Sequence, residues 1–175
     1  RKVTLISRDN GYSPPKAIEQ SRALVEEDGV LAEAGTLGTA PNTAIQKYLN
    51  SRKVPHLFPT TGAARFNDPQ NFPWTVPIYP SYISQGIIFA NYVLEKKPEA
   101  KIGVVFENDD LGKDFLKGLR DGLGGKADAM IVKQESYELT DPTVDSQILS
   151  LKGAGADTSS EERRVGSECR SGWSP

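Results

Sequence analysis

The sequence predicts an α/β fold of two lobes, each built around a doubly wound parallel sheet. Two observations support this prediction. First, short β-branched and apolar runs alternate with helical patterns of about 12 to 15 residues, which is typical of parallel strands joined by right-handed crossovers. Second, a proline-rich stretch over residues 60–82 interrupts this alternation once, and the alternation then resumes, which indicates a second lobe.

The first predicted strand and helix lie near the start of the chain. Residues 3–7 are β-branched and apolar, and residues 8–11 form a polar turn that ends in glycine. A helix is expected next, because Ser13 can cap it and prolines occupy its first positions. Apolar residues then recur at helical spacing until Asp28.

Two further strands and a helix complete the first predicted lobe, which we place at residues 1–70. Residues 30–34 are expected to form a strand, residues 35–38 a turn and residues 39–52 a helix. The apolar run 54–58 is expected to form the next strand.

The second predicted lobe covers residues 84–158 and follows a crossing segment at residues 71–83. Helical periodicity covers residues 84–94, and residues 101–106 form an apolar run typical of a buried strand. Residues 113–123 are expected to form an amphipathic helix that ends at two glycines.

One more strand and helix are expected after it. Residues 129–132 start a strand, and Asp141 and Pro142 are expected to open a helix, with Asp at the cap and proline at the first position. This helix should end at Gly153 or Gly155.

Composition excludes several classes of function. The 21 basic and 23 acidic residues give a net charge of −2, so no long-range field favours nucleic acid or membrane insertion at an anionic surface. No apolar stretch approaches the roughly 20 residues of a membrane span, and residues 1–9 do not resemble a secretory signal. Cys169 is the only cysteine and His56 the only histidine, so we expect no disulfide, metal or cofactor. His56 is expected to be a packed structural residue.

Open α/β sheets bind ligands beyond the carboxyl ends of their strands. Residues 35–39 follow a strand and open a helix, so their N–H groups favour an anion, and Thr39 can add a hydroxyl or only cap the helix. Thr60, Thr61 and Gly62 follow the next strand and offer hydroxyls and a carbonyl to an ammonium group. Because the two turns are adjacent in a parallel sheet, together they predict an amino-acid site.

The second lobe offers two more candidate ligand residues. Asp110 follows a strand and can either close over a ligand or, with Asn108 and Asp109, cap the next helix. Tyr82, like Tyr79, ends the crossing segment and can cover an apolar ligand side chain or simply pack.

Enzyme motifs fit the sequence poorly, and no catalytic residue is predicted. Residues 122–126 resemble a phosphate loop, but they end a helix instead of opening one. Gly35 and Gly38 are too close for a dinucleotide fingerprint. A magnesium site at residues 107–110 would need matching acidic residues after other strands, and the sequence has none.

Residues 159–175 are predicted to be a non-native, disordered tail. They show no apolar periodicity, and their order resembles the conceptual translation of a common sequencing adapter, departing mainly at Ser167 and Gly172. We therefore expect the native frame to end near Thr158, and Cys169 and Trp173 to have no functional role.

Several short segments together carry a more specific signal: Arg1–Val3, Arg8–Tyr12, Gly35–Thr39, Leu57–Ala63, Phe72–Thr75, Tyr79–Tyr82 and Asn108–Asp114. In this order and spacing they resemble the periplasmic branched-chain amino-acid-binding family, the substrate-binding proteins of ABC transporters. The resemblance covers nearly all of residues 1–158.

This resemblance implies two hinged lobes that close on an amino acid, branched-chain or related, or on a small carboxylate. It implies delivery to an ABC permease from a periplasmic or other extracytoplasmic location, without enzymatic activity. It implies that Thr39 holds the ligand carboxylate and Thr60–Gly62 its ammonium group. The family usually has an aromatic residue where this sequence has Leu111. It also implies a strand and helix before Arg1 and most of the second lobe after Thr158, so the fold is expected to be truncated at both ends.

Two other functions stay open from the residues alone. A nucleotide- or phosphate-using α/β enzyme would be built around residues 35–39. A ligand-sensing domain of a receptor would use the same cleft as a transport protein.

Overall fold

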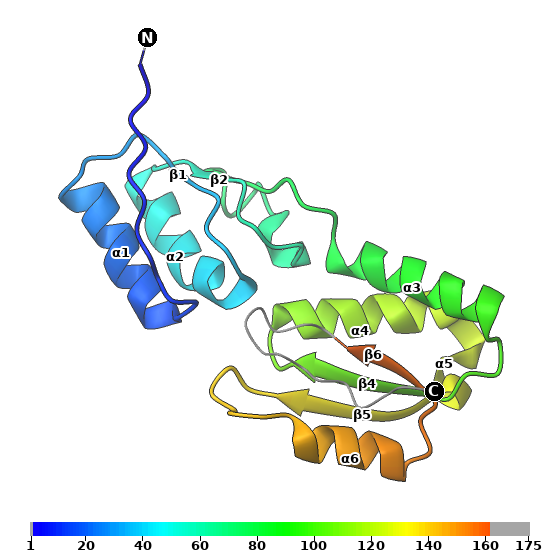
Figure 1. The fold of residues 1–175 in the computed structure, drawn as a ribbon. Helices are drawn as coiled ribbons and strands as arrows, with labels where there is room; N and C mark the ends of the chain where they lie inside the picture. The colour runs from blue at the N-terminus through cyan, green and yellow to red at the C-terminus, as the bar shows by residue number, and fades with distance from the viewer. Residues whose placement is uncertain (1, 162–175) are drawn as a thin grey trace.

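The computed structural model describes residues 2–161, which form two three-stranded parallel sheets with helices packed against them (Figure 1). The strand orders are β1-β2-β3 in the first sheet and β5-β4-β6 in the second. The predicted two-lobed α/β fold with parallel sheets is therefore confirmed.

The first lobe has very short strands and two long helices. Its apolar core lies between α1 and α2 and centres on Ala17, Ile45 and Leu49. The elements are α1 (Pro14–Glu26), β1 (Glu33–Ala34), α2 (Thr39–Arg52), β2 (His56–Leu57), η1 (Ala64–Phe66) and β3 (Thr75–Val76).

The strand predicted at residues 3–7 is wrong. Within the described part of the chain this segment pairs with no strand, and Val3 and Leu5 are 95% and 89% exposed. A β-branched sequence favours extended backbone, but a strand also needs a ladder partner. Arg8, which follows the segment, pairs instead with the Asp28 carboxylate at 2.7 Å, just beyond the end of α1.

The crossing segment contains a strand, β3, that was not predicted because its prolines suggested irregular structure. β3 pairs in parallel with β2. Asn50, in the last turns of α2, fixes β3 in place: its Oδ1 accepts the Trp74 N–H at 2.9 Å and its Nδ2 donates to Thr75 Oγ1 at 2.9 Å. Pro73 and Pro77 flank this strand without occupying it.

In the second lobe α3 and α4 cover one face of the sheet and α6 covers the other (Figure 1). Alternate residues of the central strand point to opposite faces: Ile102 and Val104 join the core beneath α3 and α4, and Val105 joins Tyr137 and Leu151 on the α6 side. The elements are α3 (Tyr82–Lys96), β4 (Ile102–Glu107), α4 (Asp110–Leu123), η2 (Gly124–Lys126), α5 (Ala127–Met130), β5 (Ile131–Tyr137), α6 (Asp145–Gly153) and β6 (Thr158–Glu161).

Two boundaries in the second lobe differ from the prediction. Asp141 does not cap α6, because this helix begins at Asp145. The Asp141 carboxylate instead accepts the Glu138 N–H at 2.8 Å and stabilises a turn. β6 pairs with β4 as far as Glu161, so residues 159–161, which we assigned to the tail, belong to the sheet. The remainder of the predicted tail, including Cys169 and Trp173, lies outside the described residues.

Glycines allow α3 and α4 to approach closely. A Cβ on Gly118 of α4 would lie 2.1 Å from the Ile83 carbonyl oxygen, and a Cβ on Gly86 of α3 would lie 2.4 Å from that of Phe115. Both contacts are with backbone, which cannot move aside as a side chain can. The layer that carries the second-lobe core therefore depends on these two glycines.

We expect Gly118→Ala to destabilise the chain by about 1–3 kcal/mol, because the added methyl overpacks the interface between α3 and α4. Gly153→Ala in α6 is the matched control, since nothing lies within 4 Å of its Cβ position. Alanine favours a helix over glycine by up to about 1 kcal/mol, so the control should be neutral or stabilising. Urea unfolding of both variants checks this, and equal stabilities would contradict it.

Candidate functional site

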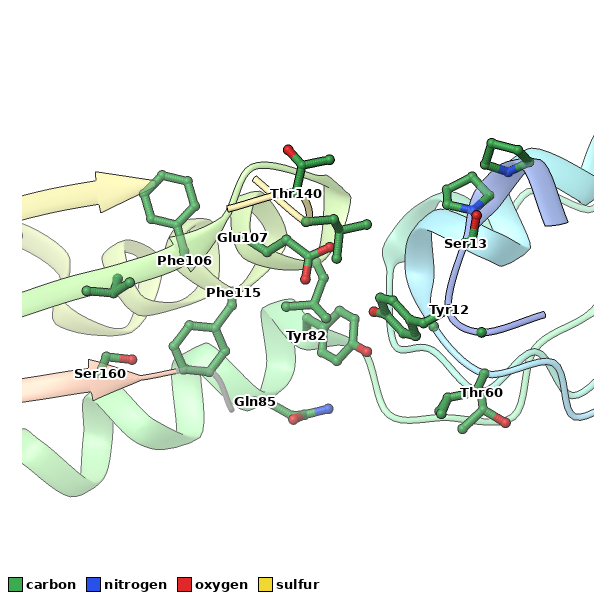
Figure 2. A pocket seen from close by; sticks show the side chains of 18 residues that line it. Tyr12, Ser13, Thr60, Tyr82, Gln85, Phe106, Glu107, Phe115, Thr140 and Ser160 are labelled. Atoms are coloured by element: carbon green, nitrogen blue, oxygen red, sulfur yellow. The ribbon is translucent and has the colours of Figure 1, made fainter. Parts of the chain in front are cut away.

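A cleft of about 1000 Å³ lies between the two lobes (Figure 2). Its first-lobe wall consists of residues 11–15, the turn residues 37–38 and Thr60. Its second-lobe wall comes from the start of α3, the end of β4, one side of α4, residues 139–140 and Ser160. The cleft therefore opens at the carboxyl ends of β2 and β4, where ligands of α/β sheets bind.

The turn that enters the cleft before α2 is held by a buried side chain. Asn42 Nδ2 donates to the carbonyl oxygens of Thr36 at 2.7 Å and Gly38 at 2.6 Å. Asn42 Oδ1 lies 2.8 Å from His56 Nε2. Since the amide nitrogen already donates twice, Oδ1 is the acceptor in this contact and Nε2 carries the proton of His56.

His56 is a packed, neutral structural residue. It is fully buried, and its ring meets that of Phe66 edge-on at 6.3 Å. Its Nδ1 has no hydrogen-bond partner within residues 2–161. Protonation would therefore create a buried, unpaired N–H, and burial lowers the pKa of His56 to about 4.

The beginning of the same turn is anchored by a buried carboxyl. Glu33 accepts hydrogen bonds from the hydroxyls of Ser21, on α1, and of Thr36, the latter at 3.0 Å. Burial raises the pKa of the Glu33 carboxyl, although the two hydroxyl donors oppose that shift. The turn is thus attached to α1 at one end and to α2 at the other.

The structure brings Thr39 and Thr61 together, but beneath the cleft and not on its surface. Their hydroxyl oxygens are 2.8 Å apart, and each residue is only 1% exposed. Thr61 Oγ1 also accepts the Ala63 N–H at 3.2 Å. The two hydroxyls therefore connect the turns that follow β1 and β2.

Of the other residues predicted for the site, Thr60 and Tyr82 line the cleft. Thr60 pairs with the neighbouring turn: its N–H donates to Thr36 O at 2.9 Å, and its carbonyl accepts the Gly38 N–H at 3.2 Å. Gly62 is buried behind the wall, and its carbonyl accepts the Tyr82 N–H at 2.9 Å. Gly62 thus connects the first lobe to the first residue of α3.

Asp110 is not part of the cleft wall within the described residues. Its carboxylate pairs with the Arg65 guanidinium at 2.8 Å, and the nearby Asp114 carboxylate accepts the Ala64 N–H at 2.6 Å. These contacts join η1 of the first lobe to α4 of the second. The cap of α4 is Asp109, whose Oδ1 accepts the N–H groups of Leu111 and Gly112, and burial raises the pKa of its carboxyl.

Several cleft residues were not predicted. Phe106 and Glu107 lie at the carboxyl end of β4, so the strand-end rule could have identified them. Tyr12 could have been suspected from the Asp9-Asn10-Gly11 turn that presents it. Phe115 lies on α4, and its direction depends on how that helix packs, which no local sequence signal reports.

Residues 2–161 contain no group of three or more His, Cys, Asp or Glu side chains arranged to hold a metal ion. Among the helices of this part of the chain, none combines the length and apolar character that crossing a membrane requires.

A family model described as periplasmic binding protein matches residues 1–160. No curated protein sequence matches the chain. Among solved structures, an extracellular ligand-binding receptor from Rhodopseudomonas palustris HaA2 is similar, with a TM-score of 0.77 and 22% identity over 90% of this chain and 44% of the other.

Two more solved structures are similar. A solute-binding protein of an ABC transporter from R. palustris, in complex with benzoate, has a TM-score of 0.77 and 16% identity over 91% of this chain and 44% of its own. A possible leucine/isoleucine/valine-binding protein from Rhodopirellula baltica SH 1 has a TM-score of 0.70 and 24% identity over 83% of this chain and 40% of its own. The chain thus spans less than half the length of these proteins.

We expect the stability of the chain to fall as pH decreases from about 6.5 to about 4. In that range the unfolded state binds a proton at His56 and the folded state does not, so unfolding is favoured by up to about 3 kcal/mol at the lower limit. NMR can follow this directly, because His56 is the only histidine. Its ring signals should titrate near pH 4, and a midpoint near 6.5 would contradict the structure. His56→Gln, which keeps a side-chain N–H, is the non-titrating control.

We also expect Thr39→Val to destabilise the chain by about 1–3 kcal/mol, because it leaves the buried Thr61 hydroxyl without its partner. In a double-mutant cycle with Thr61→Val, the double variant should lose less than the sum of the single losses, by about 1 kcal/mol. Thr143→Val, at an exposed position, should be neutral. Additive losses in urea unfolding would show that the two hydroxyls do not interact.

Proposed function

Because the chain belongs to the periplasmic binding protein family, we propose that it forms the ligand cleft of an extracytoplasmic solute-binding protein that serves an ABC permease. Proteins of this family bind small solutes and are not enzymes. The alternative of a nucleotide- or phosphate-using enzyme built around residues 35–39 is therefore wrong.

The proposal rests mainly on the polar edge of the first-lobe wall. The turn that ends at Gly38 lines the cleft and leads into the first turn of α2, where the N–H groups of Thr39 and Ala40 have no partners within their own helix. The helix dipole adds to their attraction for an anion. We propose that a ligand carboxylate binds here, beside the Thr60 hydroxyl.

The ligand proposed is an amino acid, branched-chain or related, or another small carboxylate. Similar proteins support both classes, since one is described as a possible leucine/isoleucine/valine-binding protein and another holds benzoate. Thr60 and Tyr82 are proposed as direct contacts. Thr39, Thr61 and Gly62 are proposed to hold in place the turns that present Thr60 and Tyr82. Asp110 is proposed to contact the first lobe as the two lobes close.

A receptor that senses a ligand is the second candidate function. The observation that favours it is the similarity to an extracellular ligand-binding receptor. The cleft chemistry is the same in both cases, so the two functions share one ligand and differ only in the protein partner.

The Thr60 hydroxyl donates to the Gly35 carbonyl at 3.3 Å, and we propose that it turns to the ligand instead when a carboxylate binds. We therefore expect Thr60→Ala to weaken the binding of a small carboxylate about tenfold, because one hydrogen bond to a charged group is lost. Titration calorimetry with benzoate and with leucine measures this. Thr143→Ala is the matched control, because Thr143 is exposed and outside the cleft wall. Failure of both ligands to bind at millimolar concentration, or an equal loss in the control, would overturn the proposed site.

A further inference from the structure

Tyr12 is held in an unusual backbone conformation that directs its ring into the cleft. Its φ is 57°, in the left-handed region that residues other than glycine rarely adopt. Two side chains support this turn: Asp9 Oδ1 accepts the Gly11 N–H at 2.8 Å, and Asn10 Oδ1 accepts the Tyr12 N–H at 2.9 Å. A strained position supported in this way beside a cleft indicates a functional side chain.

Tyr12 also depends on the absence of a side chain opposite it. A Cβ on Gly38 would lie 2.3 Å from the Tyr12 ring, so any other residue at position 38 would displace the ring. The Tyr12 ring therefore packs against Gly38, directly beside the start of α2. The ring and the proposed carboxylate site consequently adjoin each other.

On the other side of the cleft, the Tyr82 ring also packs against a glycine, Gly62. A Cβ on Gly62 would lie 2.3 Å from the Pro80 carbonyl oxygen and 3.1 Å from the Tyr82 ring. The Tyr82 N–H is fixed to Gly62 as well, at 2.9 Å. Figure 2 shows Tyr12 and Tyr82 facing each other, one from each lobe.

The wall behind Tyr82 continues this aromatic character. Phe106 and Phe115 line the cleft beside it, and the Phe115 ring is supported by Phe89 at 6.1 Å. Aromatic rings attract other aromatic rings by about 0.5–1.5 kcal/mol beyond the burial of apolar area. A flat aromatic ligand gains this increment from each face, and a branched aliphatic ligand does not.

We propose that Tyr12 and Tyr82 are the specificity-determining residues of the cleft and that they select a carboxylate with a flat aromatic ring over an aliphatic amino acid. This inference rests on the proposed function, because the carboxylate is placed at the start of α2. The ring then lies between the two tyrosines, and the phenylalanines of the second lobe enclose its far end.

The first test compares ligands that differ only in the ring. Benzoate and cyclohexanecarboxylate carry the same carboxylate on a six-membered carbon ring, but only benzoate is flat and aromatic. Calorimetry and ligand-observed NMR on the whole chain should show benzoate binding about tenfold tighter than cyclohexanecarboxylate and than leucine. Equal affinities for the three ligands would overturn the inference and leave the proposed function standing. Binding of none of them would overturn the proposed function itself.

The second test identifies the residues. Tyr12→Leu and Tyr82→Leu should each reduce the ratio of benzoate to cyclohexanecarboxylate affinity by about threefold, whereas Tyr12→Phe and Tyr82→Phe should preserve it. Tyr92→Leu, on the exposed side of α3, is the matched control and should leave the ratio unchanged. If a leucine variant does not fold, NMR on the unaltered chain decides instead: NOEs between the benzoate ring and the Tyr12 and Tyr82 rings are expected, and their absence would contradict the assignment. A ratio that survives both leucine substitutions would contradict the assignment.

Discussion

The first lobe depends on the hydrogen bonds that hold the turn before α2. Its strands pair over only two residues each, so the ladder between β1 and β2 is too short to fix their register strongly. The pairing continues into the turns instead, where Gly35 donates to Leu57 O and Thr60 donates to Thr36 O. Asn42 then anchors this turn to α2, and neutral His56 orients Asn42. The polar edge of the cleft is thus fixed from within the lobe.

The second lobe is placed against this edge by a few contacts of a different kind. Gly62 bonds directly to the first residue of α3, so the start of that helix follows any movement of the turn after β2. On the other side of the cleft, Arg65 and Asp110 form an ion pair that is partly exposed, and exposed pairs contribute at most about 1 kcal/mol. The first contact helps to define the geometry of the cleft, and the second is weak enough to be broken in the proposed closure of the lobes.

Elements with a strong period were predictable, and those that depend on partners were not. β4 and α4 carry their own signals, an apolar run and an amphipathic pattern, and the structure only shifts β4 by one residue and starts α4 three residues earlier. Residues 3–7 have strand propensity but no strand beside them, so they stay unpaired. The Thr and Val of β3 also favour a strand, but the prolines on both sides predicted irregular structure, and only the pairing with β2 identifies this strand. Asp141 is of a residue type that often caps helices, but its carboxylate accepts the Glu138 N–H in a turn instead.

The candidate site shows the same limit at the level of single side chains. The rule that ligands bind at strand ends pointed to two turns that line the cleft, but it could not say which hydroxyls face outward. Successive residues in extended backbone point to opposite sides, so Thr60 reaches the cleft and Thr61 is buried against Thr39. The buried pair satisfies its own hydrogen bonds, and this leaves the backbone N–H groups of the α2 terminus for a ligand. In the proposed site, recognition of a carboxylate by backbone would place few demands on side chains, and the aromatic residues opposite would then be free to determine which carboxylate is accepted.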